Sequence, residues 1–218
     1  MYALNKWADK LEPNAKNIPS IHAQHSCVYV AAGSAMVNGQ HVAAESAVYV
    51  EDFLDVRAGS DGALIWRWGI QPDNTGTGVL QGDGVDSCLR MSRRVKMFEM
   101  VPTSKWLFRL DCIMGFEGTT GLHSHPGSGI RCMLSGHLRT ESEKGENTDN
   151  SKFGDVWYEE GAYPLVSTVN DGIKTTFLRG MILTPEYARY GDTAMWIEGV
   201  PGKNAGWKSL AQQLVTLR

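Results

Sequence analysis

Short apolar runs separated by turn residues are the feature of this sequence that most limits its fold. Runs such as SCVYVAAGSAMV (26–37) and IRCMLSGHLRTES (130–142) are interrupted by glycines, and the first predicts a strand, a bend at Gly33 and a second strand. The chain has 24 glycines in 218 residues, and Asn38-Gly39 is a typical hairpin turn. Many short strands with closely spaced turns predict an all-β fold, either a sandwich or a jelly-roll barrel.

The two ends of the chain differ from the rest, because their apolar residues follow helical spacing. These residues are Leu4, Trp7, Ala8 and Leu11 near the start, and Trp207, Leu210, Ala211 and Leu214 near the end. Pro13 stops the first pattern. We therefore expect a short helix at the start, and a closing helix over residues 201–218 that packs on the β body.

A stretch rich in glycine and aspartate, QPDNTGTGVLQGDGVDS (71–87), marks the best internal boundary. It predicts an N-terminal half over residues 1–75, a linker over 76–90, and a C-terminal barrel over 91–200. The halves also resemble each other weakly, because YVAAGSAMVNG and CMLSGHLRTES can be aligned with Gly33 on Gly136. Similar segments recur in the same order, which indicates a duplicated β unit.

The charge pattern and the cysteines narrow the classes of partner and location. The net charge is −3 with both signs interleaved, so we expect no partner among nucleic acids or anionic membranes. No apolar run is long enough to cross a bilayer, and the first residues lack the apolar core of a secretion signal. The 4 cysteines are scattered, as free thiols are in a reducing compartment. We expect a cytoplasmic protein.

The segment GLHSHPGSGIRCMLSG (121–136) contains the candidate metal ligands. His123 and His125 are two residues apart, so on a strand both side chains point to the same side. Two imidazoles can share one divalent ion, iron, manganese, nickel or zinc, although such a site normally has a third or fourth protein ligand. The alternative is that both rings form hydrogen bonds within a polar cavity and bind no metal.

This segment resembles the first motif of the cupin superfamily, G-x5-H-x-H-x3-4-E-x6-G. His123, His125 and Gly136 match the motif, and Gly118 is one residue from its expected position. The second motif is echoed loosely by GDVWYEEGAYPLVSTVN (154–170). The resemblance covers roughly residues 18 to 185, and it implies a bicupin, two jelly-roll barrels in one chain, here with a short helix at each end.

The chain departs from the cupin pattern at the positions that complete a metal site. Gly129 stands where the motif has glutamate, and Leu165 where the second motif has histidine. The resemblance therefore implies an ion held by His123 and His125, with water, substrate or a distant carboxylate such as Glu159 in the remaining positions. In the first half the motif positions are Ser20, His22 and Ser26, which implies that this half has lost its site.

Arg131 is the candidate anchor for a substrate. In a regular strand it faces the same side as His123 and His125, and a guanidinium inside a barrel needs an anion. The alternative is a bulge at Pro126-Gly127 that turns Arg131 outward. We expect the substrate-binding side chains to be Arg131, Trp157, Glu159 and Tyr163.

The resemblance implies a metal-dependent enzyme of the dioxygenase, isomerase or cyclase type that acts on a small anionic or aromatic metabolite in the second barrel. Two alternatives stay open. One is a metal-free binding or sensory protein, and the other is a metal-free enzyme that uses the histidines as acid and base. Barrels of this kind have open sheet edges, which pairing of two chains can cover, so we expect a homodimer.

Overall fold

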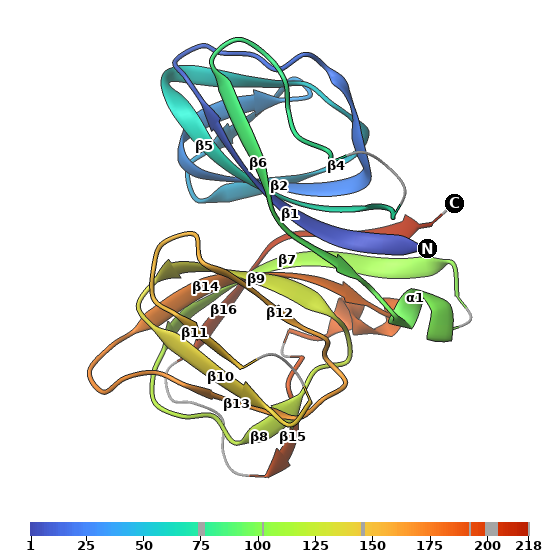
Figure 1. Cartoon of the computed structure of the whole chain (residues 1–218), viewed down its shortest axis with the longest axis vertical. Coiled ribbons are helices and arrows are strands. Elements are labelled where there is room, and N and C mark those ends of the chain that lie inside the picture. The colour runs from blue at the N-terminus through green and yellow to red at the C-terminus, as the bar shows by residue number, and fades with distance from the viewer. Residues whose placement is uncertain (74–76, 102, 145–146, 192, 199–204, 218) are drawn as a thin grey trace. The chain divides into compact units, whose positions relative to one another are not determined.

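The computed structural model describes the chain except residues 74–76, 102, 145–146, 192, 199–204 and 218, and gives only the backbone of residues 21 and 22. Strands dominate the described residues (Figure 1), which confirms the predicted all-β class. The helical elements are a single turn, α1 (Met97–Met100), and a 3-10 helix, η1 (Pro185–Arg189). Among the described residues no helix is long and apolar enough to span a membrane.

The chain divides into two units, Met1–Glu99 and Met100–Arg218. The strands of the first unit are β1 (Tyr2–Leu11), β2 (Ser20–Val37), β3 (Gln40–Ala43), β4 (Ser46–Leu54), β5 (Val56–Pro72) and β6 (Val85–Arg94). They form one sheet in the order β3-β2-β5-β1-β6, with β4 paired to β2. Its inner face is aliphatic, with Val28, Val30 and Ile65 fully buried.

The strands of the second unit form two sheets. They are β7 (Lys105–Phe116), β8 (Leu122–Ser124), β9 (Gly129–Ser135), β10 (Leu138–Ser142), β11 (Thr148–Asn150), β12 (Val156–Glu159), β13 (Leu165–Thr168), β14 (Thr175–Leu183), β15 (Met195–Glu198) and β16 (Gly206–Thr216). One sheet has the order β11-β10-β13-β8-β15, and the other β12-β9-β14-β7-β16. Figure 1 shows the two sheets as opposite walls of this unit. Phe116, Met133 and Trp157 belong to the apolar core of the unit.

The two units share a strand order. The first contains the run β2-β5-β1-β6, and the second contains β9-β14-β7-β16. When the four strands of each run are numbered in chain order, both runs read second, third, first, fourth. Gly33 and Gly136, which the sequence alignment pairs, both have positive φ, +74° and +91°. These likenesses support the predicted duplication.

The predicted terminal helices are wrong. The segment that contains Leu4, Trp7, Ala8 and Leu11 is strand β1, which pairs with β5 on one side and β6 on the other. The closing helix predicted over 201–218 is instead strand β16 from Gly206 to Thr216, which pairs with β7, and residues 201–204 and 218 lie outside the described residues. Both faces of β1 are buried, so apolar residues occur at both strand parities and imitate helical spacing.

The predicted linker over 76–90 is also wrong in its second half. Val85–Arg94 form strand β6, which extends the sheet of the first unit beside β1. Leu80 is buried in the core of the first unit, and its backbone N–H donates to Ser87 Oγ over 2.9 Å. Residues 77–84 of the glycine-rich stretch are therefore part of the first unit, residues 74–76 lie outside the described residues, and the boundary falls between Glu99 and Met100.

Candidate functional site

The second unit encloses a cavity of about 260 Å³. Strands from both of its sheets contribute to the wall. The polar lining consists of Thr120, His123, His125, Arg131, Glu159, Ser167 and Arg179. The larger apolar side chains in the lining are Ile113, Phe116, Leu138, Phe177, Trp196 and Trp207. Both predicted metal ligands and the predicted substrate anchor therefore face one space.

The two histidines are oriented by backbone carbonyl groups. Nδ1 of His123 lies 2.9 Å from the carbonyl oxygen of Gly121, and Nδ1 of His125 lies 3.3 Å from that of Thr193. A carbonyl oxygen only accepts, so this orientation places a donating Nδ1–H on each ring and turns Nε2 away from these carbonyl groups. The ring centroids are 5.1 Å apart and the rings meet edge to face. A backbone carbonyl oxygen that accepts from Nδ1 is typical of histidines that bind metals through Nε2.

Arg131 lies on β9 and is 1% exposed. Its side chain lines the cavity, as expected, so the alternative of a bulge that turns it outward does not hold. Nη2 of Arg131 lies 2.6 Å from Oε2 of Glu159. Burial lowers the pKa of Arg131 from its usual value, and the charge of Glu159 opposes that effect.

Glu159 lies on β12 directly opposite Gly129, the position at which the cupin motif has a glutamate. It pairs with Gly129 in the β12–β9 register. A Cβ on residue 129 would lie 2.6 Å from Arg131 Nη1 and 2.6 Å from the carbonyl oxygen of Gly180. Real Cβ atoms do not approach other atoms this closely, so the glycine makes room for the guanidinium. The carboxylate that lines the cavity belongs instead to Glu159 on β12.

Three neighbours fix the Glu159 carboxylate. Trp157 Nε1 donates to Oε1 over 2.9 Å, and Oε2 lies 2.6 Å from Arg131 and 3.4 Å from His125 Nε2. Burial acts to raise the pKa of Glu159, but the charge of Arg131 and the contacts with His125 and Trp157 hold it well below its usual range. Glu159 is therefore ionised, and its Oε2 lies beside Nε2 of His125.

A second charged group borders the cavity on β7 and β14. Arg179 stands opposite Arg131 in one ladder and opposite Asp111 in the next. Asp111 Oδ2 accepts from Arg109 Nε over 2.8 Å and lies 3.4 Å from Arg179 Nε. The sequence interpretation missed these three residues. Their signal is a charged residue inside an otherwise apolar strand, as in WLFRLDCIMGF (106–116).

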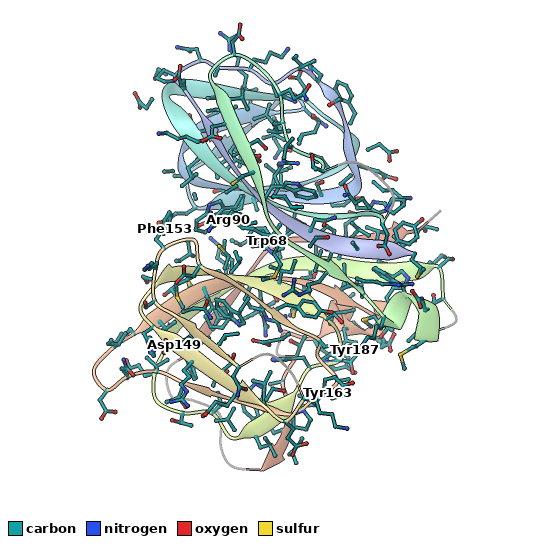
Figure 2. The ribbon with its side chains drawn as sticks, viewed as in Figure 1. Trp68, Arg90, Asp149, Phe153, Tyr163 and Tyr187 are labelled. Atoms are coloured by element: carbon teal, nitrogen blue, oxygen red, sulfur yellow. The ribbon has the colours of Figure 1, made fainter. Side chains whose placement is uncertain are left out.

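The structure brings Trp157 to the site but not Tyr163. Trp157 lies behind the cavity wall, where it holds Glu159 and packs on Phe177 with 5.5 Å between ring centroids. Tyr163 follows β12 in a loop (Figure 2), outside the cavity lining, and the ammonium group of Lys144 lies 5.9 Å from its ring centroid. Gly161 has a φ of +95°, which ends the alternation of β12 before Tyr163.

The donor set fits an ion with few protein ligands. Within the described part of the chain, no three side chains of His, Cys, Asp or Glu are grouped to hold an ion. Leu165, at the position of the missing histidine, pairs with His123 in the β13–β8 ladder and supplies no donor atom. The available atoms are Nε2 of His123 and Nε2 of His125, so water or a ligand would fill the remaining positions.

Comparisons with known proteins identify a fold. No family model and no curated protein matches the sequence. Among solved structures, the formate complex of Lactobacillus farciminis oxalate decarboxylase matches with a TM-score of 0.62 and 11% identity, over 90% of this chain and 80% of that one. A mutant of Bacillus subtilis oxalate decarboxylase matches with a TM-score of 0.60 and 14% identity, over 88% and 71%. A B. subtilis oxalate decarboxylase studied for its Mn(II) centres matches with a TM-score of 0.59 and 13% identity, over 88% and 71%. At these identities the likeness shows the fold alone, which is of the cupin type.

Proposed function

We propose that the chain is a metal-dependent enzyme that acts on a small organic anion in the cavity of the second unit. The observation that carries the proposal is that His123, His125, Arg131 and Glu159 line one cavity, where Arg131 is paired with Glu159. Two imidazoles could hold a divalent ion, and a guanidinium group binds a carboxylate. The fold neighbours include a formate complex and an enzyme with Mn(II) centres, which supports a small carboxylate and a divalent metal.

Each side chain has a distinct function in this proposal. Nε2 of His123 and of His125 holds the ion, which is iron, manganese, nickel or zinc. When bound, the ion supplies Lewis acidity that polarises a carboxylate or carbonyl group. Arg131 binds the anionic group of the substrate, and Glu159 fixes the guanidinium in position. The apolar walls keep water away from these charges.

A second candidate function is the binding of a small molecule without metal. It is favoured by the donor set, because the described residues offer no third protein ligand near the two histidines. In that case a proton lies between His125 and Glu159, and the histidine pair either binds the ligand or acts as acid and base.

Elemental analysis of the purified full-length chain tests the proposal. After incubation with each of the four metals and removal of the excess, we expect one to be retained in the wild type. We expect none in the His123→Ala/His125→Ala double variant, with an unchanged circular dichroism spectrum. His41→Ala, at an exposed histidine of the first unit, is the control and should keep the metal. Retention of metal by the double variant, or its absence from the loaded wild type, contradicts the proposal.

A further inference from the structure

The cavity has a buried charged end and a more exposed apolar end. Arg131 is 1% exposed, whereas Trp196 and Trp207 in the same wall are 37% and 41% exposed. A wall that runs from closed to open in this way places the tryptophans at the mouth and the guanidinium at the base. A ligand therefore meets aromatic surface first and charge last.

The two tryptophans come from edge strands of different sheets. Trp196 lies on β15 opposite His123, with its ring centroid 4.9 Å from the imidazole. Trp207 lies on β16 opposite Ile113. Because β15 and β16 are the last strands of their sheets, the mouth opens where the two sheets end.

Trp207 is held in place from behind. The guanidinium carbon of Arg109 lies 5.1 Å from the centroid of its ring, and Arg109 is itself fixed by the carbonyl oxygens of Tyr190 and Gly191. A Cβ on residue 191 would approach the ring to 3.3 Å, so the ring packs closely on this glycine. A preorganised aromatic surface binds a flat ligand without a large loss of side-chain entropy.

Among the described residues, the cavity lining has two guanidinium groups, those of Arg131 and Arg179, and one carboxylate, that of Glu159. Asp111 and Arg109 lie outside the lining and form a further pair of opposite charges beside Arg179. Arginine keeps its charge in proteins, so one positive charge is in excess with neutral histidines. Nη1 of Arg131 is buried and has no hydrogen-bond partner among the described residues. A buried donor of this kind favours an anionic ligand.

We propose that the ligand of this cavity is a monocarboxylate with a flat apolar body. The carboxylate binds at Arg131 and Arg179, and the body lies against Trp196 and Trp207. This inference deepens the proposed function and rests on its choice of cavity. The volume of about 260 Å³ limits the body to about one ring, since cavities for drug-sized ligands begin at about 300 Å³. Oxalate, named in the fold neighbours, has no apolar part to cover these side chains.

Isothermal titration of the full chain with four probes tests the inference, in metal-stripped and metal-loaded protein. The probes are benzoate, benzamide, acetate and oxalate. We expect benzoate to bind about tenfold to a hundredfold more tightly than benzamide, which has the ring without the charge. We expect a similar advantage over acetate, which has the charge without the ring. Oxalate should bind more weakly than benzoate.

Variants assign the two halves of the ligand to the two ends of the cavity. Arg131→Lys and Arg179→Lys should weaken benzoate about tenfold and leave benzamide unchanged, because lysine lacks the planar fork. Trp196→Ala, together with the milder Trp207→Phe, should weaken benzoate and leave acetate unchanged. Tyr163→Phe, outside the lining, is the matched control. Circular dichroism identifies any variant that fails to fold, and the probe series in the wild type then decides.

Each outcome is distinct. Acetate or oxalate binding as tightly as benzoate overturns the apolar part of the inference and leaves the proposed function standing. Equal binding of benzamide and benzoate overturns the carboxylate anchor. Failure of all four probes overturns the whole inference, and metal retention in the histidine variants then decides the proposed function separately.

Discussion

The contact between Arg131 and Glu159 shows how a single residue pair can determine the chemistry of a cavity. Both side chains are buried, and each compensates a charge that would be costly alone. Removal of one partner leaves the other charged and desolvated, which typically costs about 3–5 kcal/mol. The pair is therefore expected to matter to stability as well as to binding.

Glu159→Gln in the metal-free protein is expected to lower the free energy of unfolding by about 3–5 kcal/mol at pH 7. The folded-state pKa of Glu159 lies below its unfolded value, so its contribution is complete above the unfolded pKa of about 4.3 and is lost as the pH falls. The gap between wild type and variant should therefore narrow below about pH 5. Urea unfolding at several pH values measures it.

Glu141→Gln is the matched control for that experiment. Glu141 lies 2.6 Å from Arg139 Nη2, but both side chains of this pair are more than half exposed. Surface pairs of this kind contribute roughly 0–1 kcal/mol, so the control should change little. A gap for Glu159→Gln that widens toward low pH would contradict the assignment of an ionised Glu159.

Gly129→Ala is expected to destabilise the chain by about 1–3 kcal/mol and to weaken benzoate binding. The added Cβ meets a backbone oxygen, which cannot move aside, as well as the guanidinium of Arg131. Gly206→Ala, another strand glycine, is the control for stability, because its Cβ would find ordinary contacts of 3.4 Å or more. Thermal unfolding should show equal midpoints for wild type and Gly206→Ala, and a lower one for Gly129→Ala.

At the scale of elements, strand β1 shows why local spacing misleads. Leu4 and Trp7 are on opposite faces of this strand, which lies between β5 and β6 in its sheet, and both side chains are fully buried. Two of its three charged residues, Lys6 and Asp9, are buried too, whereas Lys10 is exposed. Lys6 Nζ lies 4.6 Å from the ring centroid of Trp66, and Asp9 forms a buried pair with Arg67. Burial of both faces removes the alternation that identifies a strand in a sequence.

The site was predictable only as far as one strand extends. His123, His125 and Arg131 belong to a single segment, and strand parity places them on one side. Arg179 and Asp111 come from strands distant in sequence, and the register that brings them to Arg131 depends on tertiary packing. Tertiary packing also explains the wrong helix predicted near the end of the chain. Trp207 belongs to strand β16, and its side chain lines the cavity instead of one face of a helix.

Ala8→Pro tests the assignment of β1 as a central strand. Proline removes a backbone donor from a strand that is paired on both sides, and we expect a loss of at least about 1–3 kcal/mol of stability. Ala44→Pro is the control, because Ala44 precedes Glu45 in a turn where φ of Glu45 is +60°. Equal thermal midpoints for the two proline variants would argue against the buried central position of β1.

At the scale of the whole chain, the two units combine a shared strand order with different interiors. The interior of the first unit is filled by an aliphatic cluster, including Val28, Val56 and Ile65. The second encloses the charged cavity. The two-barrel reading of the whole chain stays a prediction, which the shared strand order supports.

We predict that the chain forms a homodimer. Among the described residues, no strand pairs with the outer edges of β15 and β16, and these strands carry exposed apolar side chains, among them Ile197 and Leu214, which is 54% exposed. Light scattering at micromolar concentration should give a particle of twice the 24.0 kDa of one chain. Leu214→Lys should shift the equilibrium toward the single chain, and Lys208→Ala is the control on the same strand. A wild-type particle of 24.0 kDa would contradict the prediction.

The exchange between Gly129 and Glu159 has a consequence for how such proteins are compared. The two positions are neighbours in the β9–β12 ladder but thirty residues apart along the chain. A sequence motif reports the carboxylate as absent at Gly129, whereas the carboxylate of Glu159 lines the same cavity from the adjacent strand. Sites in β barrels are therefore better compared by the pairs of residues that face each other on neighbouring strands. A comparison along the chain alone counts a site as lost when the side chain has only moved to the adjacent strand.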